Sequence, residues 1–203
     1  KLYHYTTLIQ TILDPIRQTD TSVGRKSWCY IEGEQYKPVT ELVHELVDIV
    51  SKNGCLLLNI GPRPDGTIPA EQEQILLGIG EWLAVNGAAI YGTRHWRIDG
   101  EGPTPFKTGE FTDRESQIFT AQDVRFTTRD GDLYAICLGW PEEAWTIHAL
   151  SAASDICPAP IVGVELLGNH EQLAWSRDQD SLTIQVPSAK PCEHAYAFRI
   201  TLG

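Results

Sequence analysis

The chain contains no methionine, no excess of positive charge and no long apolar run, and each absence narrows its class. Its 203 residues include 16 Lys and Arg against 27 Asp and Glu, a formal net charge of -11. Such a field repels nucleic acid and anionic lipid, so we expect neither as a partner. No apolar run reaches the roughly 18 residues that span a bilayer, so we expect no membrane partner.

The start of the chain also lacks features of a complete precursor. It begins at Lys1, has no initiator methionine, and does not open with a basic and apolar signal peptide. We therefore expect either a processed chain or a piece of a longer one. A periplasmic or extracellular location is favoured, although the compartment stays open.

The cysteines are odd in number and widely spaced. No C-x-x-C pair occurs, so neither a zinc site nor a redox motif is predicted, and we expect no metal and no cofactor. Cys55 stands in an apolar run and is interpreted as a small core residue. The five cysteines are Cys29, Cys55, Cys137, Cys157 and Cys192.

What is present begins with a clear helical pattern. Over residues 39–50, apolar side chains recur at helical spacing after Pro38, which suits a first helical turn. Asn53-Gly54 is predicted to end this helix in the left-handed conformation. Acidic residues on the other side are predicted to form a solvated face; these are Glu41, Glu45 and Asp48.

A short apolar strand and a second helix follow. Residues 55–60 lack polar alternation, which predicts a strand buried on both faces, as in a parallel sheet covered by helices. From Pro69 to Val85 the spacing is again helical, and Asn86-Gly87 ends it. Helix, buried strand and helix form the repeat unit of an α/β fold.

The pattern changes after Trp96. "EGPTPF" is a connector, and "DVRFTTRDGDLYAICLGW" predicts a hairpin that turns at Asp130-Gly131. Four later segments are plausible short strands, which together suggest an antiparallel β-sandwich: "WTIHAL", "IVGVELLG", "SLTIQV" and "AYAFRIT". We therefore predict an α/β part over residues 1–96 and an all-β part over residues 97–203. A βα unit takes roughly 30 residues and a closed (β/α) barrel about 250, so residues 1–96 can supply only part of one.

Asn59 is the residue most suggestive of a site. It ends the apolar strand, and the carboxyl ends of parallel strands line the active face of such sheets. The competing interpretation is that its amide satisfies loop carbonyls. Other motifs fail: "HELVD" has Asp48 where a zinc protease has its second His, and "GPRPDG" lacks the Gly-Lys-Ser/Thr of a phosphate loop.

Trp28 and Tyr30 bracket Cys29 after a polar loop. An aromatic face can recognise the apolar C–H patch of a sugar, and plain core packing is the alternative. The histidines are scattered and are interpreted as ordinary surface or core residues; they include His4, His95, His148, His170 and His194.

Four segments, taken in order, resemble the family 29 glycoside hydrolases, the α-L-fucosidases. They are "TDTSVGRKSWCY", "LVDIVSKNGCLLLNIGPRPDGTIP", "IGEWLAVNGAAIYGTRHW" and "DLYAICLGWP". The resemblance implies a retaining hydrolase with a catalytic (β/α) barrel followed by a β-sandwich. It implies that this chain is the C-terminal portion of the barrel plus the sandwich, with the N-terminal barrel portion as a missing partner and a fucosylated glycan as substrate.

The resemblance carries over few site residues. The family's nucleophilic Asp belongs to an upstream block that nothing here matches, so the catalytic residues are unknown. Gln18 stands where some members have the Glu of a Trp-Glu pair, and Cys29 replaces the usual Gly. Glu32 and Glu34 match no family motif and are interpreted as exposed loop charges. Trp28 matches the family's Trp near the methyl-bearing side of fucose, so we predict that it contacts substrate.

The sequence is compatible with three functional hypotheses. In the first, the parent protein is a retaining α-L-fucosidase and this chain alone is inactive, because it lacks the nucleophile. In the second, the chain is a non-catalytic carbohydrate-binding or structural fragment, for which the all-β part shows no obvious aromatic platform. The third is a degenerate relative of the hydrolases.

Overall fold

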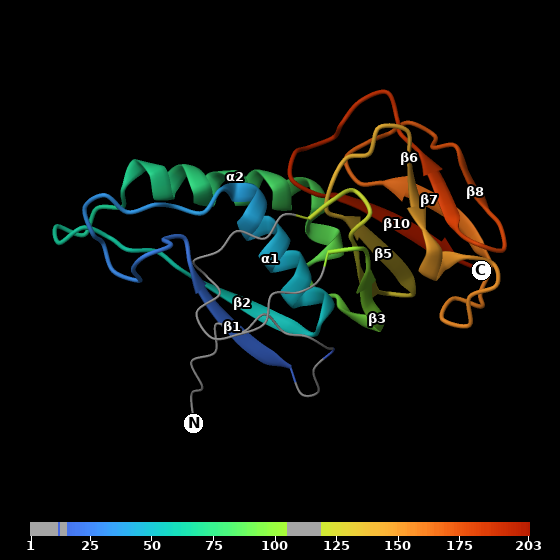
Figure 1. The fold of residues 1–203 in the computed structure, drawn as a ribbon, viewed down its shortest axis with the longest axis horizontal. Coiled ribbons are helices and arrows are strands. Elements are labelled where there is room, and N and C mark those ends of the chain that lie inside the picture. Colours follow the sequence, from blue (N-terminus) through green and yellow to red (C-terminus); the bar gives the residue numbers. More distant parts are fainter. Residues whose placement is uncertain (1–11, 13–15, 105–118) are drawn as a thin grey trace.

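The structure is a computed structural model, and it describes residues 12, 16–104 and 119–203. Within them the fold is mixed α/β, with mostly strands and two α-helices. The elongated molecule carries the helices and β1–β2 toward one end and the other strands toward the opposite end (Figure 1). In chain order the elements are β1 (Arg17–Ser22), α1 (Val39–Ser51), β2 (Gly54–Asn59), α2 (Ala70–Asn86), the 3-10 turn η1 (Gly87–Ala89), β3 (Arg94–Glu101), β4 (Val124–Arg129), β5 (Asp132–Cys137), β6 (Ala144–Ile147), the 3-10 turn η3 (His148–Leu150), β7 (Ile161–Leu166), β8 (Trp175–Arg177), β9 (Leu182–Gln185) and β10 (Tyr196–Leu202).

The predicted helices and the strand between them are confirmed. α1 begins after Pro38 and ends before Asn53, whose φ of 66° is the left-handed conformation predicted for it. α2 ends at Asn86, directly before Gly87. β2 pairs in parallel with β1, a strand that the polar sequence of residues 17–22 did not predict.

One face of the β1–β2 pair is covered by helices, and no element among the described residues covers the other. On the covered face, Leu58 packs with Leu42 of α1 and Ile75 of α2. On the other face Cys55 is exposed and Leu57 is 50% exposed. Within the described residues, β2 is covered only on the side of the helices. The prediction that this strand is buried on both faces is therefore wrong for that part of the chain. The prediction that Cys55 is a core residue is wrong for the same reason.

The larger sheet has five strands in the order β3-β4-β5-β10-β7, and all of its pairs are antiparallel. The predicted hairpin is β4–β5, and its turn residues Asp130 and Gly131 have φ of 54° and 93°. Positive φ at both positions gives the turn whose twist matches the flanking strands. The boundary predicted between residues 96 and 97 lies inside β3, which pairs with β4.

A second antiparallel sheet, in the order β6-β9-β8, contributes to the same core as the larger one. Trp145 of β6 contacts the ring of Phe198 of β10, with centroids 4.9 Å apart. Leu182 and Ile184 of β9 belong to the same apolar cluster as Phe126 of β4. The strands predicted near β6, β7, β9 and β10 are confirmed, whereas β8 was not predicted.

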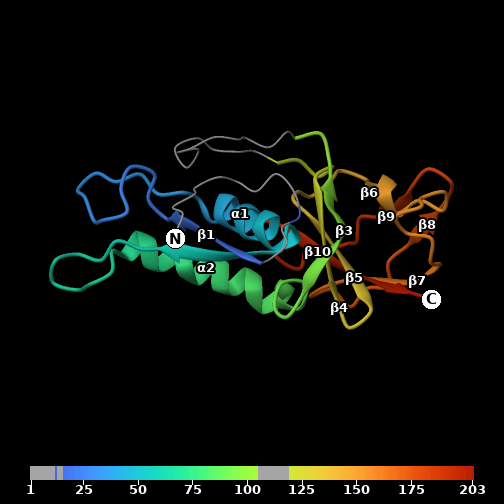
Figure 2. The ribbon, with the colours of Figure 1, turned by 90° about the horizontal axis from the view of Figure 1, so that it is seen from below.

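The opposite face of the five-stranded sheet packs against the helices. Val43 and Val47 of α1 and Trp82 of α2 share a buried cluster with Ile136 of β5 and Ala197 of β10. Figure 2 shows both helices approaching this sheet from the side of β1 and β2. The sheet is thus covered on both faces, by helices on one and by strands on the other.

None of the helices in the described part of the chain is long and apolar enough to span a membrane.

Candidate functional site

Two loops meet at the carboxyl ends of the parallel strands. Ser22, the last residue of β1, is in register with Asn59, the last residue of β2. The first loop, residues 23–36, carries Trp28, and the second, residues 60–69, carries the Gly-Pro motif. Since the carboxyl edge of a parallel sheet gathers loops that bind ligands, this edge is the candidate site.

The first loop has a defined base. Gly24 and Tyr36 form an antiparallel bridge, and the Arg25 amide donates to the Gln35 carbonyl at 2.9 Å. Trp28 lies near its tip and is 44% exposed. A large apolar side chain that stays exposed on an anchored loop is available for a ligand, whereas core packing, the alternative interpretation, would bury it.

Asn59 joins the two loops. Its Nδ2 donates to the Trp28 carbonyl at 2.8 Å and to Ser22 Oγ at 3.2 Å. The interpretation that its amide satisfies a loop carbonyl is therefore confirmed, and the loop concerned is the one that carries Trp28.

The second loop packs directly against the first. A Cβ at Gly61 would lie only 2.8 Å from the Tyr30 nitrogen and 2.9 Å from the Cys29 carbonyl carbon, so only glycine allows this approach. Gln72 of α2 holds Gly61 by its backbone: it accepts from the Gly61 amide at 2.9 Å and donates to the Gly61 carbonyl at 3.0 Å. The Arg63 guanidinium lies over the Tyr30 ring, 5.6 Å from its centroid, within the range of a cation–π contact.

Three carboxylates near this edge have different environments. Glu32 is exposed, as predicted. Glu34 is half-buried rather than exposed: its Oε1 accepts from the Lys26 and Gln35 amides at 3.0 and 2.8 Å, while its buried Oε2 has no partner among the described residues. Asp65 accepts from the amide and hydroxyl of Thr67, and these bonds lower the pKa of its carboxyl.

Gln18, at the position where a family acid might stand, is exposed and donates from Nε2 to Asp20 Oδ1 at 3.2 Å. The N–H groups of this amide donate hydrogen bonds but are not acidic, so this position supplies no general acid.

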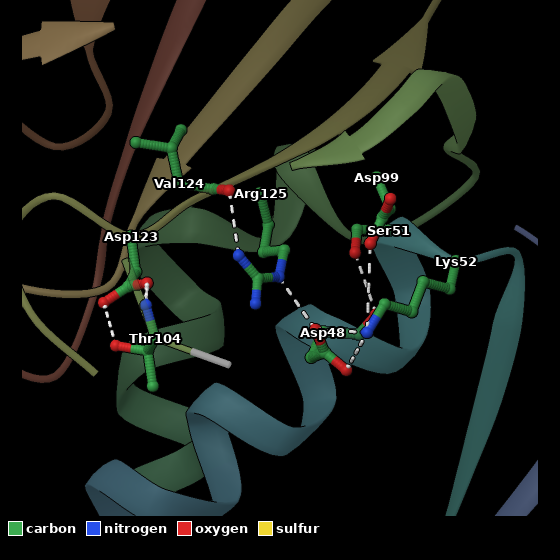
Figure 3. A network of polar contacts seen from close by, with 8 residues as sticks. All are labelled: Asp48, Ser51, Lys52, Asp99, Thr104, Asp123, Val124 and Arg125. Atoms are coloured by element: carbon green, nitrogen blue, oxygen red, sulfur yellow. Dashed lines mark hydrogen bonds and ion pairs between the residues drawn. The ribbon is translucent and has the colours of Figure 1, made fainter. Parts of the chain in front are cut away.

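A second polar cluster lies where α1 meets the five-stranded sheet (Figure 3). Asp48 accepts from Lys52 Nζ at 2.9 and 2.8 Å and from Arg125 Nε at 2.7 Å, and all three side chains are buried. Burial raises the pKa of Asp48 and lowers that of Lys52, and the attraction between them opposes both shifts. Asp99 lies 3.8 Å from Lys52 Nζ at the edge of the cluster.

The predicted solvated face of α1 is therefore wrong. Asp48 is 1% exposed, Glu41 is buried in an ion pair with Arg25, and the half-buried Glu45 accepts from the fully buried Lys37 at 3.0 Å. This face contacts the first loop and the five-stranded sheet instead of water. Arg125, a charged residue inside an apolar strand pattern, was the one sequence signal that a partner would be needed there.

The histidines do not gather into a site. His44 Nε2 donates to the His194 carbonyl at 2.9 Å, and His194 Nδ1 is 2.8 Å from Thr40 Oγ1, so both pin α1 to the segment before β10. His95, His148 and His170 lie apart, and His4 is outside the described residues. Within residues 16–104 and 119–203, no group of three or more His, Cys, Asp or Glu side chains could hold a metal ion.

Both parts of the chain match models of one protein family. The α-L-fucosidase model matches residues 5–88, and the model of the α-L-fucosidase C-terminal domain matches residues 118–201. The chain belongs to the α-L-fucosidase family. Its mixed α/β fold is that of solved fucosidases: the Thermotoga maritima α-fucosidase superposes with a TM-score of 0.72 at 29% identity, covering 95% of this chain and 41% of the other.

Named fucosidases from animals are similar over nearly the whole chain. Human tissue α-L-fucosidase is 34% identical over 200 residues, which cover 95% of this chain and 38% of the relative. Human plasma α-L-fucosidase is 33% identical over 193 residues, which cover 89% of this chain and 36% of the relative. The chain thus spans less than two fifths of the length of these fucosidases.

Proposed function

We propose that the chain is the C-terminal portion of a retaining α-L-fucosidase, composed of the last part of a (β/α) barrel over residues 1–96 and a β-sandwich over residues 97–203. The observation that carries this proposal is the match of the two family models, in order, to these two parts. The parallel β1–β2 pair under α1 and α2 fits the first part, and the shared core of the two antiparallel sheets fits the second. β3 crosses the boundary and links the two.

The parent protein hydrolyses α-L-fucosides of glycans or glycoconjugates. A retaining glycosidase needs two carboxyl groups about 5 to 5.5 Å apart, one as nucleophile and one as acid and then base. The nucleophile belongs to the preceding part of the barrel, so the 203-residue chain is inactive alone. Trp28 contacts the sugar through its exposed indole at the strand ends.

The activity is tested with p-nitrophenyl α-L-fucoside. The full-length protein should release nitrophenol and give the α-anomer of fucose first, as followed by proton NMR, whereas the 203-residue chain should release none. Turnover by the chain alone would contradict the missing nucleophile. Absence of turnover in the full-length protein would contradict the enzyme itself.

The contact with Trp28 is tested by kinetics of the full-length protein. Trp28→Ala removes apolar contact worth about 1.5 kcal/mol, so KM should rise roughly tenfold. Tyr91→Ala is the matched control, because Tyr91 is also an exposed aromatic, at 59%, but follows α2 at the opposite end of that helix from the candidate site. An equal KM for wild type and Trp28→Ala would exclude the contact.

We further propose that the missing barrel portion covers the open face of β1–β2. The exposed Cys55 thiol and the half-exposed Leu57 lie on that face. Cys55 should react with iodoacetamide in this chain and be protected in the full-length protein, as read by mass spectrometry of the peptide. Cys157, which is buried, should be protected in both. Equal labelling of Cys55 in the two proteins would contradict the proposal that the missing barrel portion covers this face.

A further inference from the structure

The two amide hydrogens of Asn59 are both used inside the protein. One bonds the Trp28 carbonyl at 2.8 Å and the other Ser22 Oγ at 3.2 Å, so the amide group has no hydrogen left to donate to a ligand. The main chain of Asn59 adds to this junction, because its carbonyl accepts from the Val23 amide at 3.1 Å. Asn59 therefore fastens both the beginning and the tip of the Trp28 loop to the end of β2.

We propose that Asn59 is a positioning residue for sugar binding: it fixes the main chain at Trp28 so that the indole is held, already ordered, at the carboxyl ends of the strands. The inference rests on the proposed contact between Trp28 and fucose. It assigns to the amide a role that acts through Trp28 and involves no contact with substrate.

The neighbouring contacts explain why one hydrogen bond can have this effect. The next two residues, Cys29 and Tyr30, lie against Gly61, and the Tyr30 ring carries Arg63. The base of the loop is closed by the Gly24–Tyr36 bridge. Trp28 stands between these two attachments, and its carbonyl bond to Asn59 fixes the loop at the residue itself.

A fixed but exposed side chain binds a ligand with less loss of conformational freedom than a mobile one. The loop bond is a side-chain donor to a backbone acceptor, so its loss should weaken fucose binding about tenfold. The effect should appear as affinity, with the fold retained, since the core clusters do not include Asn59.

The experiment uses the 203-residue chain labelled with 5-fluorotryptophan and observed by fluorine NMR. The six tryptophans give six signals, and Trp28→Phe assigns that of Trp28. Asn59→Asp keeps the side-chain shape and removes the donor, and Asn59→Ser removes it by shortening the side chain. Asn169→Asp is the matched control, because Asn169 Nδ2 also donates to a backbone carbonyl, that of Ala189 at 3.1 Å, in the all-β part.

On titration with L-fucose, the Trp28 signal should shift in the unsubstituted chain. In Asn59→Asp and Asn59→Ser the free signal should move and change width, and the apparent Kd for fucose should rise about tenfold, while Asn169→Asp should match the unsubstituted chain. An unchanged Trp28 signal with unchanged Kd in the Asn59 variants would overturn the proposal. Loss of the native signals of the other five tryptophans in both Asn59 variants would overturn it as well, because Asn59 would then maintain the whole fold.

Failure of the sugar contact is distinguishable from failure of the positioning role. If fucose leaves the Trp28 signal of the unsubstituted chain unmoved, the contact is wrong. The positioning role is then decided by the free spectra alone: a moved or broadened Trp28 signal in both Asn59 variants supports it, and an unchanged one overturns it.

Discussion

At the scale of single residues, the most consequential feature is the buried charge cluster of Asp48, Lys52 and Arg125. Removing ions from water is costly, and their attraction offsets this only when each charge keeps its partners. Here one carboxylate accepts from both cations, with Asp99 nearby on the outer side of Lys52. The cluster joins α1 to β4, and the Asp48 carboxylate is the partner that both cations share.

We therefore predict that Asp48→Asn lowers the free energy of unfolding by about 3 to 5 kcal/mol, the cost of removing one partner from a buried group of charges. The control is Glu165→Gln, which breaks the exposed pair with Arg199 at 2.6 Å and should cost about 0 to 1 kcal/mol. Urea unfolding followed by tryptophan fluorescence measures both. Equal effects of the two substitutions would mean that the cluster contributes no more than a surface pair.

At the scale of elements, the sequence predicted the helices and strands whose own residues show a regular spacing of apolar side chains. α1, α2, β2 and the β4–β5 hairpin have such patterns. β1 was missed because its buried side chains, Thr19, Thr21 and Ser22, are polar. Two of these hydroxyls accept from partners far along the chain: that of Thr21 from Lys37 at 2.7 Å and that of Ser22 from Asn59 at 3.2 Å.

The candidate site was predictable only in outline. Asn59 and Trp28 could be singled out because one ends an apolar strand and the other follows a polar loop. Their hydrogen bond could not be foreseen, because 31 positions separate them. The burial of Asp48 depends on Arg125, 77 positions away, and helical periodicity cannot report such a partner.

His44 makes the packing of α1 sensitive to acid. It is buried among the His194 carbonyl, the Phe119 ring, Arg125 and Asp123, and burial lowers its pKa below the usual 6.5. As pH falls below that value, the unfolded chain takes up a proton first, so the free energy of unfolding decreases until the folded pKa is passed.

The test compares His44→Gln with the unsubstituted chain in urea between pH 7.5 and pH 5. The variant should be less stable at pH 7.5 but should lose less stability on acidification, because Gln does not titrate. His170→Gln, at an exposed position, should keep the slope of the unsubstituted chain. A His44→Gln chain with that same slope would assign the pH dependence to other groups.

At the scale of the whole molecule, the five-stranded sheet depends on the helices. Its helix-facing side buries Tyr134, Ile136 and Ala197, and Trp82 Nε1 donates to the Ala195 carbonyl at 2.8 Å. Separated from α1 and α2, that side would face water, and Arg125 would lose Asp48. Residues 118–201 match the model of the family's C-terminal domain, but this match does not make them a unit that folds alone.

We predict that a protein of residues 92–203, which keeps all of β3, binds the dye ANS and melts at least 10 °C below the 203-residue chain, since each kcal/mol shifts Tm by about 2 to 8 °C. A protein of residues 97–203, which cuts β3, should be lower still. Comparison of the two separates the loss of the helices from the loss of β3. If residues 92–203 melt with the full chain and bind no dye, the sheet needs no helical cover.

In the part of the chain that the structure describes, β1 and β2 pair only with each other and one face of the pair is open, which has a consequence for folding during synthesis. In the proposed parent protein, the preceding strands leave the ribosome before these two, and their sheet cannot close until Asn59 has emerged. At roughly 5–20 residues per second, the segment from the start of β1 to Asn59 alone takes on the order of several seconds to synthesise. During that interval the nascent barrel presents unpaired strands, so its yield in a cell should depend on chaperones more than the stability of the finished enzyme would suggest.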